Sequence, residues 1–274
     1  MAGADEVQRE ELMAIARSLT AKFAARAAEY DRNNSFPHED FADLQAAGLL
    51  ATAVPRDHGG HGISMSNGDP LTQWRITTAV AAGDLSLGRC YEGHVNTVDL
   101  INVFGSESLK REVYPLIVEG RMRFVIWGSE PIQKDTQDLY KRLSGQTTAT
   151  RVEGGWLLNG AKAFATSAGA ATHVVITAAV DEPSVSPLEQ QQWFLADANA
   201  EGIAIDASWW HSLGMRATAS HKVDIRNVFV ADRYRLFSTE QYRQALAGAL
   251  HSAFLGQLPR RRDRGLRLRL RLSA

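Results

Sequence analysis

Apolar side chains in the first 120 residues recur every three or four positions, which is the spacing of amphipathic helices. The pattern predicts a long helix over residues 5–30. A short second helix is expected to end at Gly48, because glycine readily adopts the left-handed conformation that follows helices. A third helix begins at Asp69-Pro70, where aspartate caps the first turn and proline needs no amide partner. Two more helices are predicted at residues 86–104 and 107–118.

The period changes after Gly120, where short apolar runs separated by turn residues replace the helical spacing. The predicted strands are 124–127, 147–152, 156–158, 161–165, 173–179, 193–196, 203–205 and 223–230. Glu153-Gly154-Gly155 fits a hairpin turn. Residues 181–192 are expected to form an exposed loop. Short strands joined by hairpins predict an antiparallel barrel or sandwich.

A helical pattern returns near Ser238 and ends at Leu258. The expected fold class is therefore a multidomain α+β protein. Its parts are a helical N-terminal domain (1–122), an antiparallel β-barrel or sandwich in the middle (123–235), the first helix of a truncated C-terminal helical bundle (236–258), and an Arg/Leu-rich tail (259–274). No internal repeat occurs, and the βαβ alternation of a Rossmann unit is missing.

The composition is that of an ordinary globular protein, with 45% hydrophobic and 22% charged residues in 274. No apolar run is long enough to span a bilayer, and the acidic N-terminus lacks the apolar core of a signal peptide. The expected location is therefore the cytoplasm.

The single cysteine, Cys90, excludes an intrachain disulfide and a thiolate metal cluster. We therefore expect Cys90 to be a buried, small apolar residue, and we expect no metal site.

The charge is unevenly distributed. Seven of the 30 Lys and Arg residues follow Leu258, which leaves residues 1–258 with a net charge of −7. An acidic body does not indicate a nucleic-acid partner. The abrupt Arg/Leu alternation indicates a shifted reading frame or truncated gene product, and the functional alternative is a basic arm for nucleic acid or acidic lipid.

Three separated segments carry the chemistry. They are Trp127-Gly128-Ser129-Glu130-Pro131, Asn159-Gly160-Ala161-Lys162-Ala163-Phe164-Ala165-Thr166-Ser167 and Leu213-Gly214-Met215-Arg216-Ala217-Thr218. With Val54-Pro55…Gly59-Gly60 and Phe104-Gly105-Ser106-Glu107, their order and spacing resemble the acyl-CoA dehydrogenase superfamily. The resemblance covers about residues 5–235. It implies a helical domain, a β domain and a C-terminal four-helix domain, and a homo-oligomer.

The resemblance also implies a flavin, FAD or alternatively FMN, held by Trp127, Gly128, Ser129, Phe164, Ala165 and Thr166. Trp127 and Ser129 would line one side of the flavin, Phe164 would pack against its ring, and the Thr166 hydroxyl would lie near N5. Such a cofactor needs an apolar wall and hydrogen bonds at its polar edge. Without the family, Phe164 would be an inward strand residue and Trp127 a core residue. Thr166 and Ser129 would then make only local backbone hydrogen bonds.

The sequence departs from the dehydrogenases after Pro131. Their Gly-x-Gly-Ser-Asp loop, which helps to hold the thioester, is replaced by Ile132-Gln133-Lys134-Asp135-Thr136. Trp127-Gly128 and a late helical histidine, His94, instead resemble the flavin-dependent monooxygenase branch with its dibenzothiophene-type enzymes. His94 is therefore a weak catalytic candidate. The structural alternative is a histidine with satisfied hydrogen bonds on its helix.

Three functions follow as expectations. The first is α,β-dehydrogenation of an acyl-CoA thioester with hydride transfer to FAD N5, for which an electron-transfer partner would be needed. The second is monooxygenation by reduced flavin and oxygen, with a flavin reductase as partner. The third is an inactive, truncated fragment. The glutamate base of the dehydrogenases has no match, since Glu240 and His251 lack any supporting motif.

Overall fold

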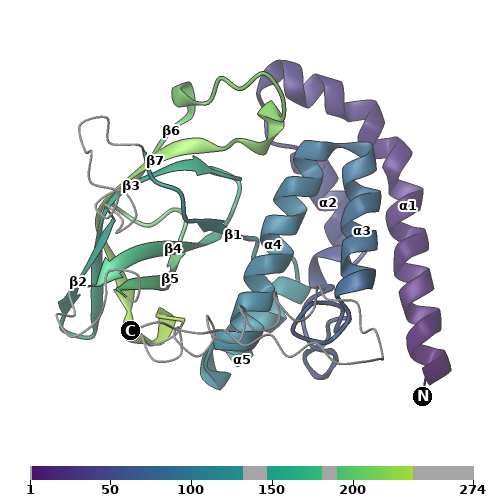
Figure 1. Cartoon of the computed structure of the whole chain (residues 1–274), viewed down its shortest axis with the longest axis horizontal. Helices are drawn as coiled ribbons and strands as arrows, with labels where there is room; N and C mark the ends of the chain where they lie inside the picture. Colours follow the sequence, from purple (N-terminus) through teal and green to yellow (C-terminus); the bar gives the residue numbers. More distant parts are fainter. Residues whose placement is uncertain (1, 132–146, 181–189, 237–274) are drawn as a thin grey trace, which may run out of the picture.

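The computed structural model describes residues 2–131, 147–180 and 190–236. It shows a mixed α+β architecture in which a group of helices packs beside a curled sheet (Figure 1). The helices are α1 (Ala2–Asn33), α2 (His38–Ala46), α3 (Pro70–Gly83), α4 (Leu85–Phe104) and α5 (Glu107–Val118). The strands are β1 (Phe124–Trp127), β2 (Thr148–Val152), β3 (Gly155–Ala165), β4 (His173–Val180), β5 (Gln191–Asp197), β6 (Ile203–Asp206) and β7 (His221–Ala231).

The helix boundaries follow the local signals in the sequence. The Asp69 side chain accepts a hydrogen bond from the Thr72 amide, and Pro70 occupies the first turn of α3, as predicted. Asp84 caps α4 in the same way. Gly48 has a φ of 72° after α2, which confirms its predicted left-handed conformation. Such caps satisfy amide groups that have no partner inside the helix.

The sheet has seven strands in the order β1-β4-β2-β3-β7-β6, with β5 paired to β4. The prediction of an antiparallel sheet was only partly correct. Four pairings are antiparallel, but β4 pairs in parallel with both β1 and β2. The β2–β3 hairpin lies between β1 and β4 in the sequence, and β3 lies between β2 and β4. Neither parallel pair is therefore joined by a tight turn, as parallel neighbours need a longer connection.

Strand β3 combines two predicted strands, 156–158 and 161–165. Its register with β7 shifts between Leu158 and Gly160 and again between Lys162 and Ala165. Such irregularities re-aim side chains locally. At the second one, Phe164 has a φ of 55° and its side chain is 57% exposed. The alternative expectation of an inward-facing Phe164 was therefore wrong.

The helices and the sheet are joined through named polar contacts. The Arg216 guanidinium donates to the Asp31 carboxylate at 2.9 and 3.2 Å, and the Arg216 amide donates to the other carboxylate oxygen at 3.0 Å. These bonds connect the end of α1 to the turn η4 (Arg216–Thr218), which precedes β7. They hold the pKa of Asp31 below its ordinary value. The motif Leu213–Arg216 thus has a structural role at this junction.

No helix in the described part of the chain is long and apolar enough to cross a membrane. The predicted helix from Ser238 to Leu258 and the tail 259–274 lie outside the described residues. The boundaries of the four predicted domains stay a prediction.

Asp40, on α2, is fully buried beside Arg26, which forms ion pairs with Asp40 and Asp43. Burial raises the pKa of Asp40 to about 6, against the lowering effect of Arg26, and nearby Asp84 adds to the rise. The folded protein therefore binds this proton more tightly than the unfolded chain. The stability that protonated Asp40 contributes is present below about pH 4 and is lost as pH rises through 6.

We predict that Asp40→Asn becomes progressively more stable relative to the wild type as pH rises from 4 to 7, because the variant buries no charge there. Urea unfolding at a series of pH values measures this difference. The exposed Asp57→Asn serves as the control. A difference between Asp40→Asn and the wild type that does not change with pH would contradict the prediction.

Candidate functional site

The first two sequence motifs meet at the ends of β1 and β3. Trp127 is 1% exposed, and its indole N–H donates to the Thr166 carbonyl at 3.1 Å. The Ala163 amide donates to the Ser129 carbonyl at 2.9 Å. Gly128 and Ser129 are exposed at the surface, whereas Ala165 is buried. The two motifs therefore form one continuous structure, although more than 30 residues separate Trp127 from Thr166.

A row of three hydroxyl groups connects the second motif to the third. Thr166 Oγ1 lies 3.2 Å from Ser220 Oγ, which lies 2.8 Å from Thr218 Oγ1. Thr218 Oγ1 in turn donates to the Met215 carbonyl at 2.9 Å. We call Thr166, Ser220 and Thr218 the hydroxyl row. Thr218 ends the third sequence motif but had no role assigned to it. Ser220 was missed, and its only signal was its position two residues after that motif.

An exposed aromatic surface lies next to the hydroxyl row. Phe164 makes edge-on contacts with Trp209 and Trp210, at ring-centroid distances of 5.0 and 6.1 Å. Trp210 is held in turn by a hydrogen bond from its indole N–H to the Arg216 carbonyl, at 3.0 Å. We call Phe164, Trp209 and Trp210 the aromatic ledge. Phe164 reaches this position because its left-handed backbone turns the ring outward, two residues before Thr166.

Lys162, two residues before Phe164 on β3, has a fully buried side chain. Its ammonium group donates to Glu130 Oε1 at 2.7 Å, Thr177 Oγ1 at 3.1 Å and the Gly128 carbonyl at 3.4 Å. Burial lowers the pKa of Lys162, and the Glu130 carboxylate opposes that shift. Lys162 and Glu130 each stand in a motif that the sequence singled out. Nothing in the sequence showed that they pair, because β3, which carries Lys162, and the segment after β1, which carries Glu130, are brought together only by folding.

His94 does not join this group. It is fully buried on α4 with both ring nitrogens engaged. Nε2 lies 2.9 Å from the Leu50 carbonyl, and Nδ1 accepts the Phe124 amide at 3.1 Å. Burial lowers the pKa of His94 to about 4, so the ring is neutral near pH 7. These contacts support the structural alternative for His94 rather than a catalytic role.

Cys90 is buried, as expected, with its thiol 3.8 Å from the Thr218 carbonyl. Burial raises the pKa of this thiol to about 12, so it is not a reactive thiolate. In the described part of the chain, no group of three His, Cys, Asp or Glu side chains could hold a metal ion. The chemistry of the site therefore rests on aromatic rings, hydroxyl groups and one buried ion pair.

Comparison with known proteins gives the family. A model of the acyl-CoA dehydrogenase N-terminal domain matches residues 5–121. A model of the acyl-CoA dehydrogenase middle domain matches residues 135–228. The two consecutive matches span most of the chain, which therefore belongs to the acyl-CoA dehydrogenase superfamily and contains its N-terminal and middle domains.

Relatives come from two branches. Dibenzothiophene monooxygenase of Rhodococcus qingshengii is 30% identical over 222 residues, which cover 80% of this chain and 49% of that protein. Benzylmalonyl-CoA dehydrogenase of Aromatoleum aromaticum is 27% identical and is matched over 82% of this chain and 56% of that protein. The crystal structure of FMN-bound TdsC from Paenibacillus sp. A11-2 is similar at a TM-score of 0.73 and 25% identity, over 86% of this chain and 56% of that one. The chain thus spans about half the length of these relatives.

We predict that Lys162→Met lowers the free energy of unfolding by about 3–5 kcal/mol, because it removes the buried partner of Glu130. Urea unfolding monitored by circular dichroism measures the loss. Lys222→Met is the matched control, since Lys222 pairs with Asp224 at 3.1 Å on a partly exposed surface. The control should cost less than about 1 kcal/mol. A similarly small loss in Lys162→Met would contradict the assigned role.

We predict that His94 makes stability pH-dependent. Its folded pKa lies below the ordinary value, so the unfolded chain binds the proton more readily. The stability that neutral His94 contributes is present above about pH 6.5 and is lost as pH falls toward 4. His94→Gln should remove this loss, which unfolding curves at pH 4.5 and 7.5 would show. The exposed His211→Gln serves as control, and equal pH dependence in wild type and His94→Gln would overturn the prediction.

Proposed function

We propose that the aromatic ledge and the hydroxyl row bind the ring system of a flavin. The observation that carries the proposal is the outward-turned Phe164, which lies two residues before the Thr166 hydroxyl. A flavin ring combines flat apolar faces with a polar edge, and this site offers an exposed aromatic side chain beside the buried hydroxyl row. The residues present therefore fit the group that the family implies.

The contribution of the protein itself would be to position the flavin ring. Thr166 Oγ1 shares a hydrogen bond with Ser220, so its position is set before any ligand arrives. Trp127 anchors the Thr166 carbonyl, and Lys162 holds Gly128 and Glu130 against β3 and β4. Bound here, a flavin would supply the redox chemistry. FMN is favoured as the form because TdsC was solved with FMN bound, and FAD is the alternative.

For the reaction, we propose monooxygenation of a small molecule by reduced flavin and oxygen, with a separate flavin reductase as partner. Support comes from the relatives named dibenzothiophene monooxygenase and from the replacement of the thioester-binding loop by residues 132–136. This reverses the order of the two expectations drawn from the sequence. The chain spans about half the length of these relatives, so a homo-oligomer and the full activity are proposals for experiment to test.

Dehydrogenation of an acyl-CoA thioester is the second candidate. The similarity to benzylmalonyl-CoA dehydrogenase favours it, because that match covers as much of the chain as the monooxygenase match does. The two reactions would use the same flavin surface. They differ in the electron path, since oxygen is consumed in one and an external acceptor is reduced in the other.

The proposed site predicts that Phe164→Ala weakens flavin binding at least tenfold, because a large apolar contact is lost. Thr166→Val should weaken it about fivefold, since it removes one hydrogen bond. Titration of FMN and FAD, followed by flavin fluorescence, measures both changes. Phe229→Ala is the matched control, since Phe229 is 54% exposed and pairs with Leu157 near the opposite end of β3. Equal affinity in all four proteins would refute the site.

The reaction is tested on the same protein. With chemically reduced FMN and an aromatic thioether or indole as probe, the monooxygenase proposal expects oxygen consumption coupled to an oxygenated product. With an acyl-CoA and an artificial electron acceptor, it expects no turnover. Turnover in the second assay alone would support the dehydrogenase instead. Flavin binding without turnover in either assay would support the fragment hypothesis.

A further inference from the structure

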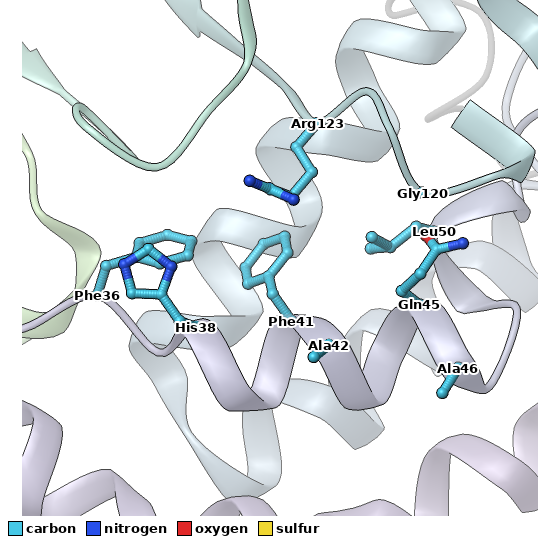
Figure 2. Close-up of a pocket in the computed structure, with 9 residues that line it drawn as sticks. All are labelled: Phe36, His38, Phe41, Ala42, Gln45, Ala46, Leu50, Gly120 and Arg123. Carbon is cyan, nitrogen blue, oxygen red and sulfur yellow. The ribbon is translucent and has the colours of Figure 1, made fainter. Parts of the chain in front are cut away.

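A separate cavity of about 370 Å³ opens between α2 and the segment that connects α5 to β1 (Figure 2). Its apolar wall consists of Phe36, Phe41 and Leu50, with the methyl groups of Ala42 and Ala46 beside them. Phe36 and Phe41 contact each other at a centroid distance of 5.0 Å and an interplanar angle of 36°. The volume is at the lower end of the range of small-molecule pockets, roughly 300–1,000 Å³.

One cation dominates this cavity. The Arg123 side chain points toward the side of the cavity that Phe36 and Phe41 line (Figure 2). Its Nε and Nη2 atoms donate to the Ala170 carbonyl at 3.3 and 3.2 Å, which fixes one edge of the guanidinium plane. No carboxylate among the described residues forms an ion pair with Arg123. The Nη1 side of the plane is therefore available to an anion, and a guanidinium edge suits a planar carboxylate.

The other polar side chains in the lining add no charge near pH 7. His38 contacts Phe36 edge-on at 5.0 Å. Burial and the nearby charge of Arg123 both lower the pKa of His38, so its ring is neutral. Gln45 donates to the Val118 carbonyl at 3.0 Å. No acidic side chain among the described residues lines the cavity, so the one charge in this lining is the positive charge of Arg123.

We propose that this cavity binds a small aromatic carboxylate, with the carboxylate on the Arg123 guanidinium and the ring on Phe36 and Phe41. A neutral arene would lack the charge-assisted hydrogen bonds, and a small inorganic anion would leave the apolar wall uncovered. The cavity is distinct from the flavin surface. Arg123 directly precedes β1 and Trp127 ends it, so at ~3.3 Å per residue they are roughly 13 Å apart.

The test uses 4-fluorobenzoate and its neutral counterpart 4-fluorobenzamide, followed by ¹⁹F NMR line broadening on the full chain. We expect the carboxylate to bind at least tenfold more tightly than the amide. Arg123→Gln should weaken carboxylate binding at least tenfold without changing amide binding. Arg121→Gln is the matched control, since Arg121 lies two residues away, is exposed and pairs with Glu119 instead. That control should bind like the wild type.

Arg123 also supports the fold through Ala170, so a second variant avoids that contact. Ala42→Phe fills the cavity from an exposed helix position, and it should abolish binding while the thermal unfolding temperature stays unchanged. Phe164→Ala should bind the carboxylate normally, which separates this cavity from the flavin surface. The proposal fails if the carboxylate does not bind, if carboxylate and amide bind equally, or if Ala42→Phe and Arg123→Gln bind as the wild type does.

Discussion

The geometry of the candidate site depends on the burial of one ammonium group. Lys162 lies where β1, β3 and β4 meet, and its side chain has no contact with solvent. Removing a charge from water is costly unless partners replace the hydration shell. The partners are Glu130 and Gly128 after β1 and Thr177 on β4, so satisfying the charge requires all three segments to be in place. This requirement fixes the part of β3 that leads to Phe164 and Thr166.

The helices impose a second constraint on the same sheet. Asp31 at the end of α1 binds Arg216 with three hydrogen bonds, and the Arg216 carbonyl accepts the indole N–H of Trp210. The position of the aromatic ledge is thereby linked to α1. At the opposite end of β1, His94 accepts the Phe124 amide and contacts Leu50, so α4 determines where β1 begins. The helical part is thus joined both to the aromatic ledge and to the start of β1, the strand that ends at Trp127.

The sequence predicted the elements that local signals control. The caps at Asp69-Pro70 and the glycine at Gly48 were correct because a few neighbouring residues determine them. The split of β3 into two strands was wrong, because an irregular strand has an interrupted apolar pattern although pairing with β7 continues. The parallel pairing of β4 was missed for a related reason. Strand direction depends on which distant strand is the neighbour, and apolar alternation carries no such information.

What the sequence determined by itself is the order of helical and strand segments, the family, and the residues that the motifs bring forward, because each depends on spacing along the chain. Only the tertiary structure decided how those residues act. It turned Phe164 outward through a left-handed backbone, enclosed both nitrogens of His94, and brought Lys162 to Glu130. It also assembled the cavity of Phe36, Phe41 and Arg123, in which Arg123 comes more than 80 residues after the two phenylalanines. Burial and pairing depend on neighbours in space, and folding alone selects those neighbours.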